Sequence, residues 1–222
     1  MMCIFKRLFH VSPLRILAAV FLLFLSCTPT YIIVKLDKNQ LAASRLAVLP
    51  FYNCTINFPG SVEKMFGKGG KDSLIVRFLQ ETIAARLVKT SGFHSVSVCD
   101  RPVGAVEEDS VKVNNGCIGI LRPAGKFSCA GGVPDFVLFV YNVAVDSGTV
   151  EYKERDVVFS ETNLEFSAEY VYMKAESKEI VSYGKIQKNY TSLFPAVNRK
   201  SFKKLAEKIS DELLVEGHYS KN

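Results

Sequence analysis

Histidine and tryptophan are the residues that this sequence most lacks. The chain has three histidines and no tryptophan, and only His94 and His218 lie beyond residue 26. A Ser-His-Asp triad or a three-histidine zinc site therefore has almost nothing to be built from. The run Glu107-Glu108-Asp109 lies in a glycine-bearing stretch and is typical of solvated charge, not of a catalytic carboxylate pair. We expect no enzymatic activity, no metal site and no cofactor.

Concentrated positive charge is also missing. The formal net charge is +6, but Lys6, Arg7 and Arg15 lie in residues 1–26 together with no acidic residue, which leaves +3 for the remainder. No run of five or more basic residues occurs, so we expect no nucleic-acid partner. The hydrophobic content of 48% and the charged content of 23% are those of an ordinary globular chain, and 222 residues suit one domain.

No apolar run is long enough to span a membrane. Residues 16–25 are uncharged and apolar, but they reach only about 16 Å as a helix, against a bilayer core of about 30 Å. With the basic residues before them, they predict a signal peptide over residues 1–26. The segment that ends at Ser26-Cys27 resembles a bacterial lipobox, although Phe24 stands where that motif has leucine. We expect lipid on Cys27 and a tether over 27–44, in which the apolar patch 31–34 could add a short edge strand. The alternative is an ordinary secretory signal that is cleaved nearby.

Hydrophobic periodicity indicates two helices and several strands in the rest of the chain. A helix is expected to begin with Asp72 as its N-cap and to end at Ser91-Gly92, and a second helix is expected over 198–215. The strands are expected at 45–51, 93–98, 135–141, 164–172 and 179–190. These elements predict an α/β (α+β) domain over 45–217, with a mixed sheet of about five strands, two main helices packed on it and the order β-α-β-β-β-β-α. Residues 218–222 would be a tail.

Two long loops are expected between these elements. One covers residues 52–71 and the other is an irregular, glycine-rich insertion at 99–132. Because loops on a rigid scaffold often carry recognition, Lys68 and Lys71 are candidate contacts to a protein partner. The glycines before Asp72 also allow phosphate binding at a helix start, but their spacing is not that of a Walker loop.

Cysteine usage favours structural cross-links over redox chemistry. Cys54, Cys99, Cys117 and Cys129 follow Cys27, and no CxxC motif occurs. In an oxidising compartment we expect at least one disulfide among Cys99, Cys117 and Cys129; in a reducing one they would be buried thiols. Two sequons, at Asn53 and Asn189, would matter only if the protein were a eukaryotic secreted one.

Several segments together resemble a group of bacterial envelope domains. The segments are the strand at 45–51, the helix and strand over 78–98, and the stretches 134–138 and 178–184. They are similar to the periplasmic α/β domains of the TolB N-terminal, LpoB and CsgG group. The resemblance implies a non-enzymatic lipoprotein of the cell envelope, anchored to the outer membrane, with its domain in the periplasm or at the cell surface.

The resemblance also implies what such a domain would contact. The implied partners are envelope proteins, in an adaptor or assembly role. The alternative is a self-assembling secretion or surface component of the curli-pore type, which would be a homo-oligomer. The strand pair 164–172 and 180–190 is not expected to be pore-forming, because Glu165, Glu169, Lys185 and Lys188 are better explained by a solvated sheet face.

Overall fold

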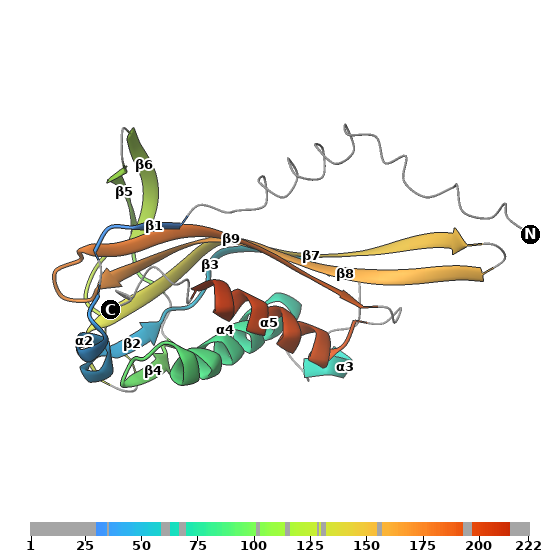
Figure 1. The fold of residues 1–222 in the computed structure, drawn as a ribbon, viewed down its shortest axis with the longest axis horizontal. Helices are drawn as coiled ribbons and strands as arrows, with labels where there is room; N and C mark the ends of the chain where they lie inside the picture. Colours follow the sequence, from blue (N-terminus) through green and yellow to red (C-terminus); the bar gives the residue numbers. More distant parts are fainter. Residues whose placement is uncertain are drawn as a thin grey trace, which may run out of the picture.

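The architecture is a mixed β-sheet with helices on one face and a β-hairpin on the other (Figure 1). We analysed a computed structural model of the chain. It describes residues 30–34, 36–58, 63–66, 70–100, 103–113, 116–127, 129, 132–154, 157–192 and 197–213. The predicted α/β class with a mixed sheet is confirmed.

The main sheet has seven strands in the order β1-β9-β8-β7-β2-β4, and β3 also pairs with β7. Strands β2, β3 and β4 run parallel to their neighbours, whereas β1, β8 and β9 are antiparallel to theirs. The strands are β1 (Thr30–Ile32), β2 (Arg45–Val48), β3 (Tyr52–Asn57), β4 (Ser95–Val98), β7 (Phe136–Glu154), β8 (Val157–Lys174) and β9 (Ile180–Ser192).

The centre of the sheet is the first part of β7. Residues 136–141 are all buried, because apolar side chains on both faces of this stretch pack against a layer on each side. The predicted central strand at 135–141 is therefore confirmed.

Two helices cover one face of the sheet. They are α4 (Lys71–Thr90) and α5 (Arg199–Leu213), and shorter helices are α2 (Lys38–Ala43) and α3 (Glu63–Phe66). The predicted stripe of α5 is fully buried, with Phe202, Leu205, Ile209 and Leu213 in the core. The N-cap of α4 is Gly70 and not Asp72, which lies in the first turn, where a negative charge favours the helix dipole. Within the described ranges, every helix is too short or too polar to cross a membrane.

Three segments differ from the expected loops and tether. The predicted tether contains the short edge strand that its apolar patch allowed, β1, but it also contains α2, and Leu36 and Leu41 are buried in the core. The loop 52–71 begins with β3, and the insertion 99–132 holds a hairpin of β5 (Val106–Val113) and β6 (Gly116–Pro123). β3, β5 and β6 lack strong apolar alternation, so they are stabilised more by pairing with other strands than by the strand propensity of their own residues.

The strands β7 and β8 are also much longer than expected. Their register continues to the pair Glu154↔Val157, whereas β8 pairs with β9 only as far as Thr162↔Ser192. Figure 1 shows the resulting two-stranded arm, which extends past the helices. The hydrophobic pattern did not predict this extension, because the arm contains polar residues such as Ser147 and Thr149 that give no apolar pattern.

Candidate functional site

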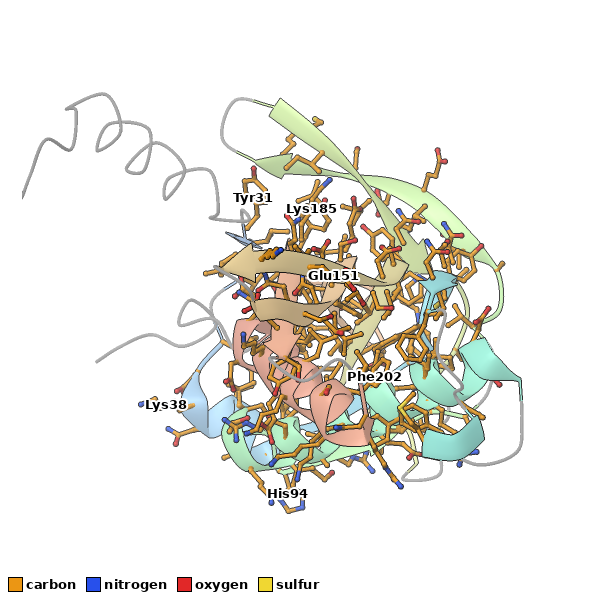
Figure 2. The ribbon with its side chains drawn as sticks, turned by 90° about the vertical axis from the view of Figure 1, so that its right-hand side faces the viewer. Tyr31, Lys38, His94, Glu151, Lys185 and Phe202 are labelled. Carbon is orange, nitrogen blue, oxygen red and sulfur yellow. A yellow bond between two sulfur atoms is a disulfide. The ribbon has the colours of Figure 1, made fainter. Side chains whose placement is uncertain are left out.

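An open cleft lies between the β5–β6 hairpin and the sheet face that is opposite α4 and α5, here called the outer face. The cleft has a volume of about 440 Å³. Figure 1 shows the hairpin standing on the outer face, and Figure 2 shows Tyr31 and Lys185 on the hairpin side, away from Phe202 in the helical layer. The residues that line the cleft are Glu108, Asp109, Gly119, Ile120, Leu121, Tyr141, Asn142 and Glu169.

Apolar contacts hold the hairpin over the sheet, and ion pairs join its two strands to each other. Val111 and Ile120 are buried against outer-face residues of β7 and β8. The Arg122 guanidinium lies 3.1 Å from the Asp109 carboxylate and 3.5 Å from that of Glu107. Beyond β6, the Lys178 ammonium lies 3.6 Å from the centroid of the Phe127 ring.

A disulfide adds a covalent link at the base of the hairpin. Cys99, after β4, is joined to Cys129, after β6, and their Cα atoms are 5.0 Å apart, which is within the usual range. The loop that this link closes contains the whole β5–β6 hairpin. Cys117 is an exposed thiol on β6, so the structure pairs two of the three candidate cysteines and leaves the third free.

The floor of the cleft is one cross-strand row, Tyr141–Glu169–Lys185, on β7, β8 and β9. The Lys185 ammonium lies 2.9 Å from the Glu169 carboxylate. Tyr141 is 1% exposed, and no described residue makes a hydrogen bond of good geometry to its hydroxyl. Burial raises the pKa of Tyr141, and the nearby negative charge of Glu169 raises it further. For the same two reasons, the pKa of Tyr183, next to this row on β9, is raised to about 12.

A β-bulge in β7 makes this floor possible. The register shifts between Tyr141 and Ala144, where Asn142 has a φ of 50°. The shift turns Val143 into the helix-side core, although Tyr141, two residues earlier, lies on the outer face. The Asn53 amide donates a hydrogen bond of 2.7 Å to the Asn142 side-chain oxygen and fixes the bulge. Bulges often redirect side chains beside functional sites in this way.

Acidic residues continue from the cleft along the outer face. Glu161, Glu165 and Glu169 alternate with buried residues of β8 and so lie on one face, and Asp146 of β7 is the cross-strand partner of Glu165. We call Asp146, Glu161, Glu165 and Glu169 the acidic strip. Neighbouring amides orient it, because Asn57 donates to Asp146 over 2.7 Å and Asn163 donates to Glu165 over 2.6 Å.

Of the two predicted contact lysines, the structure describes only the backbone of Lys71. Lys71 is the first residue of α4, which packs on the helix side of the sheet, and its side chain lies outside the described residues. Lys68 and the predicted lipid-attachment residue Cys27 also lie outside them. Among the residues that the structure describes, no group of three His, Cys, Asp or Glu side chains could hold a metal ion.

Part of the outer face is predictable from the sequence. Glu165, Glu169 and Lys185 do lie on it, as the prediction of a solvated sheet face requires. Lys188 does not: it pairs with Phe166 on the helix side, where its ammonium lies 2.6 Å from the carboxylate of Glu212 on α5. Tyr141 and Asn142 were missed as site residues, because their place in the cleft depends on the bulge and on the distant β5–β6 hairpin.

The remaining free thiol lies away from the cleft. Cys54 on β3 is half-buried against the helix-side core. Burial, with a smaller contribution from the charge of Asp72, raises its pKa to about 11. At neutral pH it is therefore a protonated thiol of low reactivity.

No family model matches the chain, and no curated protein matches it. Among solved structures, the chain is similar to a PelC dodecamer from Paraburkholderia phytofirmans, with 12% sequence identity and a TM-score of 0.41. The match covers 85% of this chain and 96% of the PelC chain. A homologue of the putative neuraminyllactose-binding hemagglutinin from Helicobacter pylori has 12% identity, coverage of 85% and 91%, and a TM-score of 0.43. The rare lipoprotein B from Shewanella oneidensis has 13% identity, coverage of 77% and 91%, and a TM-score of 0.28. At these values the likenesses identify no family for this chain.

Proposed function

We propose that this protein is a lipid-anchored, non-enzymatic component of a bacterial cell envelope that acts as an adaptor by binding another protein. The observation that carries the proposal is the cleft on the outer face. It is open, it lies on a rigid sheet, and hydrogen bonds and ion pairs fix its charged walls. Such a surface suits recognition, since its polar groups are oriented before a partner arrives.

The ionic contacts in the cleft favour binding over catalysis. Asp109 and Glu169 are each paired with a cation, Arg122 and Lys185 respectively. Both carboxylates are thus engaged in ion pairs, and none of the residues that line the cleft is a histidine, the side chain that most often serves as a general acid or base. The proposed role therefore depends on fixed charge and shape.

The anchor would hold the domain close to the membrane. The chain from Cys27 to the start of β1 at Thr30 spans at most about 10 Å when it is extended. The edge of the sheet that carries β1 would thus lie near the lipid surface, with the exposed side chains of Ile32 and Ile33 beside it.

The test is a pull-down of the lipidated protein from its own membranes after mild cross-linking. We expect one envelope protein to be enriched reproducibly over a control that carries an unrelated lipoprotein domain. The absence of any enriched protein would contradict the adaptor role. Turnover in a broad hydrolase screen would contradict the non-enzymatic part.

A second candidate is a self-assembling secretion or surface component. The observation in its favour is an open sheet edge. β9 pairs with β8 along one side, but on its other side β1 pairs only with residues 182–184, and no described strand pairs with residues 185–192 there. Unpaired edge strands can add a strand from another copy. Size-exclusion chromatography with light scattering on the full chain in detergent separates a ring from a monomer.

A further inference from the structure

We propose that the cleft and the acidic strip bind an extended segment of the partner protein that carries lysine or arginine side chains. This inference rests on the proposed adaptor function and names the chemistry of the partner. It is carried by the charge of the outer face, by the buried hydroxyl of Tyr141, which makes no hydrogen bond of good geometry, and by the spacing of the acids along β8.

The charge of the outer face is opposite to that of the chain as a whole. The chain has a formal net charge of +6, yet Glu108, Asp109 and Glu169 line the cleft. Asp109 and Glu169 are each paired with a cation, whereas Glu108 and the rest of the acidic strip add negative charge beside them. The basic side chains of α5 lie on the other side of the sheet, where Arg199, Lys200 and Lys203 are exposed. The outer face thus presents carboxylates to a positively charged partner, which steers association and sets orientation.

The Tyr141 hydroxyl supplies an independent reason to expect a ligand. A buried hydroxyl without a hydrogen bond is unfavourable, and this one lies in the wall of the cleft beside Glu169. A lysine ammonium or an arginine guanidinium has only N–H donors, which the phenol oxygen and the carboxylates can accept. The apolar side chains of Ile120 and Leu121 line the same cleft and suit the aliphatic stem of such a residue.

The spacing of the acids matches an extended chain. Glu161, Glu165 and Glu169 recur at every fourth residue of β8, which places them about 13 Å apart at about 3.3 Å per residue. An extended peptide with a basic residue at every fourth position has the same repeat. The cleft volume of about 440 Å³ lies in the range of ligand pockets, so one basic side chain would enter the cleft and others would follow the strip.

Fluorescence anisotropy with a synthetic peptide tests this inference. The probe is a labelled serine-rich peptide with lysine at every fourth position, and its control has glutamate in place of lysine. We expect the full-length protein in detergent to bind the lysine peptide and not the glutamate peptide, at an ionic strength of about 0.15 M. Failure of the lysine peptide to bind would overturn the proposal.

Substitutions with matched controls locate the binding. The double change Glu108→Gln and Glu165→Gln should weaken binding about 3- to 10-fold, because each exposed ion pair contributes a small factor. Glu151→Gln is the matched control, since Glu151 is exposed on the helix-side face of the same arm, opposite Ser160. Equal weakening by the control would mean unspecific charge attraction and would overturn the proposal.

Tyr141→Phe tests the hydroxyl alone. It keeps the ring and should weaken peptide binding about 3- to 10-fold with little change in the melting temperature, since the hydroxyl makes no hydrogen bond of good geometry in the free protein. Unchanged affinity would remove Tyr141 from the site. If the membrane pull-down still captures a partner equally well with the double glutamine variant, the adaptor function stands and the cleft is not its site.

Discussion

At the scale of single residues, close packing fixes the register of the sheet. Gly184 of β9 pairs with Tyr170 of β8, and the tyrosine ring covers the glycine backbone. A Cβ atom at position 184 would lie 2.7 Å from the ring and from its hydroxyl. Only glycine therefore allows Tyr170 to be fully buried at this point of the core.

Gly184→Ala should lower the free energy of unfolding by about 1–3 kcal/mol, because the new methyl group forces the buried ring to move. Urea denaturation measures this change. Gly148→Ala on β7 is the control: nothing lies within 4 Å of its Cβ position, so its stability should stay close to that of the wild type. Equal stability of the two variants would contradict the packing described for Gly184.

The tyrosines of the outer face make stability depend on pH in the alkaline range. The pKa of Tyr183 is raised from 10.0 to about 12, so the folded state keeps a proton that the unfolded state loses. This contribution is fully present below pH 10 and is lost as pH rises from about 10 through about 12. Between these pH values, the free energy of unfolding measured with urea should fall less steeply for Tyr183→Phe than for the wild type. Parallel pH profiles of wild type and variant would contradict the raised pKa.

At the scale of elements, the disulfide determines how firmly the β5–β6 hairpin is held. The link between Cys99 and Cys129 spans a sequence separation of 30 residues. In the chain-entropy model a loop of this size contributes roughly 3–4 kcal/mol. The hairpin makes its other contacts through few buried side chains, among them Val111 and Ile120, so the link matters for the cleft.

Thiol counting on the denatured, unreduced mature protein should find Cys54 and Cys117 free and Cys99 and Cys129 protected. The double change Cys99→Ser and Cys129→Ser should lower stability by about 3 kcal/mol. Cys117→Ser is the control and should have little effect, since Cys117 is exposed. Four free thiols would show that the compartment keeps the cysteines reduced.

Elements that are stabilised by their own apolar residues could be predicted from the sequence, whereas elements that depend on distant pairing partners could not. Strand 135–141 and helix α5 have dense apolar patterns, which are local and visible in one sequence. Strand β3 alternates between exposed and half-buried residues and is stabilised by pairing with β7. The cleft forms only where β7, β8 and the β5–β6 hairpin meet. These contacts join residues far apart in the sequence, so no local sequence pattern predicts the cleft.

At the scale of the whole molecule, the proposed anchor and the proposed binding surface lie on different parts of the sheet. The lipid would hold the β1 edge of the sheet near the membrane, the helices would cover one face, and the outer face would be free for a partner. Lipid on Cys27 is the first requirement of this arrangement.

Mass spectrometry of the mature N-terminus should find an acylated Cys27, and Cys27→Ser should move the protein from the membrane fraction to the soluble one. Cys117→Ser should stay in the membrane fraction, which controls for the loss of a cysteine as such. An unmodified N-terminus beyond residue 27 would contradict the anchor.

Site-specific photo-cross-linking in native membranes would show which face of the protein contacts the partner. A photoreactive side chain at Ser167 would stand on the outer face between Glu165 and Glu169, and one at Lys203 would stand on the exposed side of α5. We expect an adduct with one envelope protein from position 167 and none from position 203. An adduct from position 203 alone would contradict the claim that the outer face is the binding surface.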